Sequence, residues 1–137
     1  MNQALEKAGP WAALLGRVMI AAIFVTAGWS KIGAGYAGTQ GYMQSMGVSG
    51  ALLPLVIAAE LGGGIAIVVG LFTRLSALGL GVFSVASALI FHAAADPMQQ
   101  IMFMKNIALA GGFLFLVAYG AGSFSLDALI AARRRGI

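Results

Sequence analysis

Glu60 is an acidic residue near the middle of an unbroken apolar stretch that runs from Leu52 to Phe72. A carboxylate at that depth needs either a buried positive partner or a proton. The three other acidic residues lie near the ends of the chain or between its apolar stretches: Glu6, Asp96 and Asp127. Glu60 is therefore the one acid predicted to be buried, and its surroundings are where chemistry should be sought.

Five more polar side chains lie inside apolar stretches or at their edges: Arg17, Lys31, His92, Lys105 and Asn106. Ionisable groups are costly inside a bilayer, usually face the protein interior and pair with one another. We therefore predict that these five residues and Glu60 form a buried polar cluster or ligand pocket. The pattern assigns no catalytic role to any of them.

Helical spacing predicts how these side chains are arranged. Arg17 and Lys31 are fourteen residues apart, about four turns, so they should share one helix face about 21 Å apart. Glu60 lies about 12 Å from the outer end of its helix, deeper than Lys105 and shallower than Arg17. Either cation would keep Glu60 ionised, so the expected buried pair is Glu60 with Arg17 or with Lys105. Lys31, His92 and Lys105 should form the outer rim of a pocket floored by Arg17 and Glu60.

Composition determines the class of protein. Hydrophobic residues make up 61% of the chain and charged residues 9%, with a mean hydropathy of +0.96, whereas soluble domains have roughly 25% charged residues. This is an integral membrane protein, and residues 1–137 should form a single domain with no room for a soluble catalytic unit. The lack of cysteine excludes disulfides and thiolate metal sites, and the single histidine excludes a bis-histidine haem. We expect no metal site and no covalent cofactor.

Four apolar stretches are long enough to cross roughly 30 Å of hydrocarbon, at residues 11–32, 52–72, 75–93 and 101–121. The predicted fold is all-α, a transmembrane four-helix antiparallel bundle. Arg74 should mark a tight turn between the second and third helices. The connection from Gly33 to Gly50 has room for a short helix at the membrane interface.

Basic residues predict the orientation. Lys7, Arg74 and the run from Arg133 to Arg135 fall on one side of a four-span topology, so both termini should be cytoplasmic. Topology alone accounts for the triple arginine, and we do not expect nucleic-acid binding. The expected location is a bacterial-type inner (plasma) membrane, with the lipid bilayer as the first partner and homo-oligomerisation left open.

Several short segments, in this order and spacing, resemble the DoxX family of small four-helix membrane proteins. They lie between Leu14 and Asp127: Leu-Gly-Arg17, Ala-Gly28-Trp-Ser-Lys31, Glu60-Leu-Gly-Gly-Gly, Gly-Leu-Phe-Thr-Arg74, Phe91-His92, Lys105-Asn106-Ile-Ala-Leu-Ala-Gly111-Gly112 and Ser125-Leu-Asp127. One departure is in the outer connection, where Ser49-Gly50 stands at a place where members often have a proline.

The family that the chain resembles is named after a membrane subunit of a thiosulfate:quinone oxidoreductase. The resemblance implies that its relatives belong to redox-stress and quinone-stress systems, where they are often partners of soluble enzymes. It implies an accessory or anchoring subunit of a quinone-linked redox system, with a redox partner protein and a quinone in the polar cluster. Whether the chain itself is an enzyme stays open. Two other classes remain: a structural scaffold or folding partner whose buried charges only lock the bundle, and a transport protein for a small solute or protons.

Overall fold

The computed structural model describes residues 1–136, which form helices and turns without any strand in that range. The elements in order are α1 (Asn2–Ser30), α2 (Gly35–Ser45), η1 (Gly50–Leu52), α3 (Leu53–Ile57), η2 (Ala58–Gly62), α4 (Gly63–Val69), α5 (Thr73–Phe91), α6 (Pro97–Tyr119) and α7 (Leu126–Arg134). Four helical units are long and apolar enough to cross a membrane: Asn2–Ser30, Gly50–Val69, Thr73–Phe91 and Pro97–Tyr119. The predicted all-α fold with four spanning helices is confirmed.

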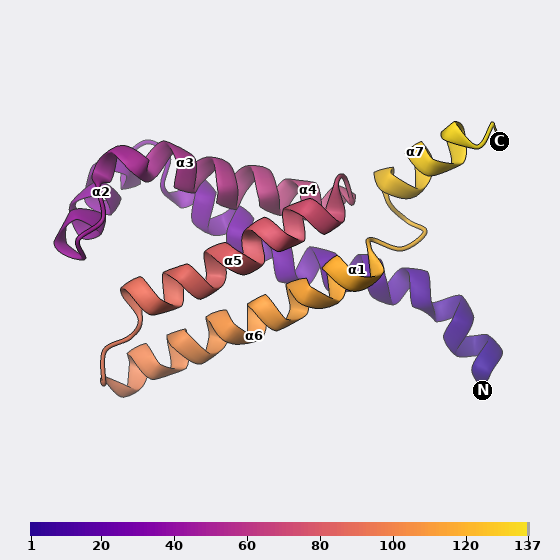
Figure 1. The fold of residues 1–137 in the computed structure, drawn as a ribbon, viewed down its shortest axis with the longest axis horizontal. Coiled ribbons are helices and arrows are strands. Elements are labelled where there is room, and N and C mark those ends of the chain that lie inside the picture. The colour runs from indigo at the N-terminus through magenta and orange to yellow at the C-terminus, as the bar shows by residue number, and fades with distance from the viewer. Residues whose placement is uncertain (137) are drawn as a thin grey trace.

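The spanning helices alternate in direction, so both termini lie at one end of the bundle (Figure 1). We call this the terminal end; it also contains α7 and the turn between α4 and α5. The opposite end, called the loop end, contains α2 and the connection between α5 and α6. The α5 and α6 helices pack as an antiparallel pair, and α1 packs along η2 and α4. The short helix predicted between the first two spans is α2.

The second spanning unit is not one regular helix. It opens with η1, a 3₁₀ turn capped by the Ser49 hydroxyl, which accepts a hydrogen bond from the Ala51 amide at 3.3 Å. Pro54 follows at the start of α3, where a missing amide hydrogen costs little. The segment η2 is π-helical, and Glu60 lies in the middle of it. Such π turns insert one extra residue into a helix and are often found at functional sites; hydropathy did not predict this one.

Aromatic and small residues form the core between the spans. The rings of Phe24 and Phe113 meet edge to face with centroids 5.4 Å apart, beside Ile67 and Leu80. Buried alanines such as Ala77 let α5 come close to its neighbours. Large apolar side chains cover the outside of all four units and are exposed, as expected for surfaces that face lipid tails: Leu15, Leu55, Leu75, Val82, Leu114 and Phe115 are examples.

Candidate functional site

Glu60 forms an ion pair with Lys31 near the loop end. The Lys31 Nζ atom lies 2.7 Å from Glu60 Oε2, and the two side chains are 21% and 8% exposed, respectively. It is the one side-chain ion pair in residues 1–136. The predicted pairing of Glu60 with Arg17 or Lys105 was therefore wrong, because depth along a helix does not determine which way a side chain points around it.

Gly28 brings the two charges together. A Cβ atom at Gly28 would lie 2.9 Å from the Leu61 backbone nitrogen and 3.2 Å from Glu60 Cβ, so only glycine permits α1 to approach η2 this closely. Lys31 follows the last turn of α1, and its ammonium is also 3.4 Å from the Ala27 carbonyl oxygen. A cation is favourable at the C-terminal end of a helix. Lys31 therefore reaches Glu60 while staying close to its own helix.

A cavity of about 210 Å³ opens beside this ion pair. Five of the six predicted site residues line it: Lys31, Glu60, His92, Lys105 and Asn106. His92 Nδ1 is hydrogen-bonded to Gln99 Oε1 at 2.7 Å, while Lys105 Nζ lies 3.8 Å from the Met102 sulfur. Lys105 thus adds a positive charge that no carboxylate within the described chain pairs with.

A second cavity, of about 310 Å³, continues from the first between α2, α3 and α5. The two cavities share Lys31, Glu60, Phe83, Ser87 and His92. Beyond these residues the lining becomes largely apolar and aromatic, with Thr39, Tyr42, Met43, Val48, Leu52, Val56, Ala86, Ile90 and Phe91. We call this second cavity the apolar groove and the first the polar cavity.

Arg17 does not belong to the polar cavity. It is 1% exposed and lies toward the terminal end, where its guanidinium donates hydrogen bonds to the carbonyls of Ile67 and Val68, at 3.2 and 3.1 Å, and of Phe124. Ile67 follows Glu60 by seven residues, or about 10 Å of helix. The prediction that Arg17 floors the pocket was wrong: Arg17 instead binds carbonyls in the last turn of α4, and it shares that of Ile67 with the Gly70 amide.

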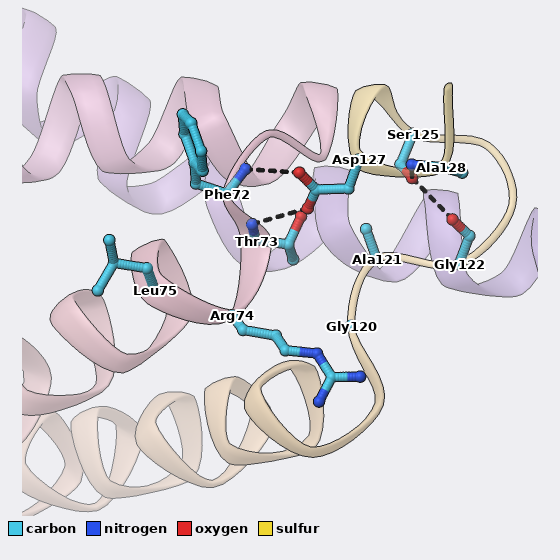
Figure 2. Close-up of a pocket in the computed structure, with 10 residues that line it drawn as sticks. All are labelled: Phe72, Thr73, Arg74, Leu75, Gly120, Ala121, Gly122, Ser125, Asp127 and Ala128. Atoms are coloured by element: carbon cyan, nitrogen blue, oxygen red, sulfur yellow. Dashed lines mark hydrogen bonds between the residues drawn. The ribbon is translucent and has the colours of Figure 1, made fainter. Parts of the chain in front are cut away.

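Asp127 is a second structural residue at the terminal end, a role that its position near the end of the chain did not predict. Its carboxylate accepts hydrogen bonds from the backbone amides of Phe72 and Thr73, both at 2.8 Å, and its own amide donates to the Gly70 carbonyl at 2.8 Å. Figure 2 shows Asp127 of α7 reaching across to the start of α5. Asp127 thus caps α5 from a distant part of the chain, since Phe72 supplies no side-chain cap.

The environment of Asp127 favours its charged form. Partial burial raises the pKa of Asp127, but hydrogen bonds from Thr73 and Phe72 and the positive charge of Arg17 lower it by more, so the pKa lies below its ordinary value.

One pattern in the sequence does indicate the start of α7, the helix that contains Asp127. Ser125 precedes the apolar and basic pattern of α7, and its hydroxyl accepts a hydrogen bond from the Ala128 amide at 3.1 Å.

A third cavity, of about 490 Å³, lies beside Asp127 at the terminal end and is lined in part by Arg74 and Gly120 (Figure 2). Its charged groups are already bonded to the protein: Asp127 to the amides of α5, and Arg74 to the Val117 carbonyl of α6 at 3.3 Å. At this end, charged side chains form hydrogen bonds with backbone amides and carbonyls at the ends of helices. The polar cavity differs in that the ammonium of Lys105 there has no carboxylate partner within the described chain.

The polar cavity combines hydrogen-bond donors with one acceptor of high charge. Lys31 and Lys105 are cationic donors, the Asn106 amide both donates and accepts, and Glu60 accepts. Residues 1–136 contain no group of three histidine, cysteine or carboxylate side chains placed to hold a metal ion. The polar cavity is suited to a small polar group that contains oxygen atoms. The rest of such a ligand could be apolar and lie in the apolar groove.

Comparison with known proteins places the chain among membrane proteins of one family. The model of the DoxX family matches residues 12–93. The inner membrane protein YqjF of Escherichia coli (strain K12) is 48% identical over 118 residues, which cover 85% of this chain and 90% of the relative. The inner membrane protein YphA of the same organism is 36% identical over 129 residues, covering 88% of this chain and 91% of the relative. No solved structure is significantly similar to the chain.

Proposed function

The chain belongs to the DoxX family, and from that premise we propose that it is an inner-membrane accessory or anchoring subunit of a quinone-linked redox or oxidative-stress system. In this proposal the polar cavity binds a quinone head group. Electrons are carried by the quinone and by a redox partner protein, while this chain binds and orients the quinone. The location in an inner membrane is supported by the names of the two relatives.

The observation that carries the proposal is the polar cavity at the Lys31–Glu60 pair, with its apolar continuation. A quinone presents two carbonyl oxygens, which accept hydrogen bonds from cationic or amide donors such as Lys105 and Asn106. The reduced quinol presents hydroxyls, which donate to a carboxylate such as Glu60. One set of side chains can therefore hold both oxidation states, as an accessory quinone site requires.

The orientation in the membrane follows from the basic residues. Lys7, Arg74 and Arg133 to Arg135 belong to the terminal end of the bundle (Figure 1). By the positive-inside rule we propose that both termini are cytoplasmic. The polar cavity then opens near the opposite face of the membrane, and a partner at the cytoplasmic face would meet α7.

Binding of a quinone to purified protein tests the proposal. Trp29, two residues before Lys31, is the fluorescence reporter for a bound quinone, in a Trp11→Phe background. We expect saturable quenching by ubiquinone-1, together with quinone in an organic extract of protein purified in mild detergent. Lys105→Ala should raise the dissociation constant about tenfold or more, because a hydrogen bond from a charged group contributes about 1.5–3 kcal/mol.

Lys7→Ala is the matched control, since it removes an exposed lysine at the other end of the bundle. It should leave the dissociation constant unchanged. Absence of saturable quenching by the folded protein, or equal affinity of wild type and folded Lys105→Ala, would contradict quinone binding at this cavity.

A scaffold or folding-partner role is the second candidate, and one observation favours it over transport. The polar groups at the two ends of the bundle are separated by an apolar core that contains Ile67, Leu80 and Phe113. A solute or proton route would have to cross that apolar layer. Recovery of a stoichiometric partner protein without any bound quinone would support the scaffold.

A further inference from the structure

We infer that the ligand of this protein carries a long hydrocarbon tail, which lies in the apolar groove and enters sideways from the bilayer between α2 and α5. This inference rests on the proposed function and names the class of quinone: one with an isoprenoid-type tail, and not a water-soluble quinone. It also gives α2 a role, as one wall of the entry path.

The first support is the continuity of the two cavities. The polar cavity and the apolar groove meet at the Lys31–Glu60 pair, and His92 lines both. A head group held by Lys105 and Asn106 therefore has its remaining atoms directed either into the groove or into protein. A molecule with one polar and one apolar end fits both cavities at once.

The second support is that the lining of the groove changes from charged to apolar side chains along its length. From Lys31 and Glu60 its lining passes to Val56 and Met43, and Met43 is almost fully buried. The outer part is formed by Leu52, Ile90 and Tyr42, which are 45%, 43% and 49% exposed. The groove is thus open to the surroundings of the bundle through Leu52, Ile90 and the ring of Tyr42, a largely apolar entrance that suits a path from lipid.

The third support is an aromatic contact at the groove. The rings of Tyr42 from α2 and Phe91 from the end of α5 stack with centroids 5.5 Å apart and an interplanar angle of 26°. Stacked flat rings provide a smooth apolar wall on which an unsaturated chain can lie. A tail packed against these rings gains dispersion contacts along its length.

Two analogues with the same head group test the inference: ubiquinone-0, which has no tail, and ubiquinone-2, which has two isoprene units. Their binding is measured by Trp29 quenching with the protein in lipid nanodiscs. The Ala86→Phe substitution places a ring in the groove from an exposed position of α5. We expect it to weaken ubiquinone-2 binding at least fivefold and to leave ubiquinone-0 binding unchanged.

Val82→Phe is the matched control. It adds an aromatic ring on the same helix, one turn away, at a position that is 62% exposed and does not line the groove. It should change neither affinity, and it corrects for partitioning of the tailed analogue into lipid. Tyr42→Ala provides a second test from another helix, and it should also weaken only the tailed analogue.

The outcomes separate the two proposals. If Ala86→Phe and Tyr42→Ala weaken both analogues equally, or weaken neither, the tail does not lie in the groove, although the head-group site stands. If the folded wild-type protein binds neither analogue, the proposed function fails and this inference fails with it.

Discussion

The Lys31–Glu60 pair is asymmetric in its surroundings. Glu60 is the more buried partner, in the middle of the second spanning unit, whereas Lys31 lies at the end of α1 with 21% of its side chain exposed. A long lysine side chain can turn toward the membrane surface when its partner is lost, whereas a buried carboxylate cannot. The cost of breaking the pair should therefore depend on which residue is removed.

Substitutions at the two positions should show this difference in stability. We expect Lys31→Met to lower the free energy of unfolding by an amount near the about 3–5 kcal/mol typical of a buried charge left unpaired. Glu60→Gln should cost less, because an amide oxygen still accepts a hydrogen bond from Lys31. The double substitution Lys31→Met with Glu60→Met should be more stable than Lys31→Met alone. Unfolding is followed by circular dichroism in detergent, and a double substitution no more stable than Lys31→Met alone would show that the unpaired Glu60 charge is not the source of the loss.

The sequence identifies Glu60 as a buried acid but does not identify its partner. A lone acid in an apolar stretch is visible in any hydropathy profile, whereas its contact with Lys31 depends on the rotation of two helices and on a π turn. Asp127 was missed for a different reason. Its partners are backbone amides of Phe72 and Thr73, and every residue except proline has such an amide.

At the scale of elements, the packing of α1 against the second spanning unit depends on small residues. Gly28 faces η2, and Gly64 faces α1, where an added Cβ would lie 2.8 Å from Val25 Cγ2. Close approach of this kind is how membrane helices gain packing energy, since lipid tails are as apolar as the side chains that they replace. The same contact positions the ion pair.

Two glycines of α1 provide a matched comparison. Gly28→Ala should destabilise the protein and weaken the Lys31–Glu60 contact, because the new methyl group would lie 2.9 Å from backbone. Gly16→Ala meets nothing within 4 Å, so it should be neutral or stabilising by up to about 1 kcal/mol through helix propensity. Midpoints of thermal unfolding in detergent measure both. Equal midpoints for the two variants would show that α1 can shift freely against η2.

Hydropathy predicted the number of spanning helices because each must bury about twenty apolar residues in lipid. It did not predict where α1 begins, since the helix extends to Asn2 through polar residues that no apolar pattern marks. The π turn at η2 also escaped prediction, because it depends on how neighbouring helices pack around Glu60 and not on the composition of the segment.

At the scale of the whole molecule, the two ends of the bundle contain different kinds of polar contact. The loop end contains the Lys31–Glu60 pair and the two connected cavities, whereas the terminal end contains Arg17, Arg74 and Asp127, each bonded to the end of a helix. The pocket predicted from the sequence contains both Arg17 and Glu60. The structure separates them: Arg17 binds the end of α4, whereas Glu60 pairs with Lys31 beside the polar cavity.

Cysteine labelling tests how these ends lie in the membrane. The chain has no cysteine, so single substitutions can be read without background. Ser45→Cys and Ala94→Cys at the loop end should react with an impermeant thiol reagent in spheroplasts prepared from cells. Ala8→Cys at the terminal end should react only after the membrane is permeabilised. The reverse pattern would place the polar cavity near the cytoplasmic face.

The contacts at the terminal end also impose an order on biosynthesis. Arg17 is made early, in the first span, but one of its three carbonyl partners belongs to Phe124, which follows the fourth span. The amides of Phe72 and Thr73 likewise lack their carboxylate acceptor until Asp127 has been translated. A nascent chain that has inserted all four helices therefore still lacks these bonds until the residues around α7 have emerged. Translation of the C-terminal segment is thus the step that completes the hydrogen bonds between helices inserted earlier. A ribosome stalled ahead of Phe124 would hold a bundle that is inserted but lacks these bonds.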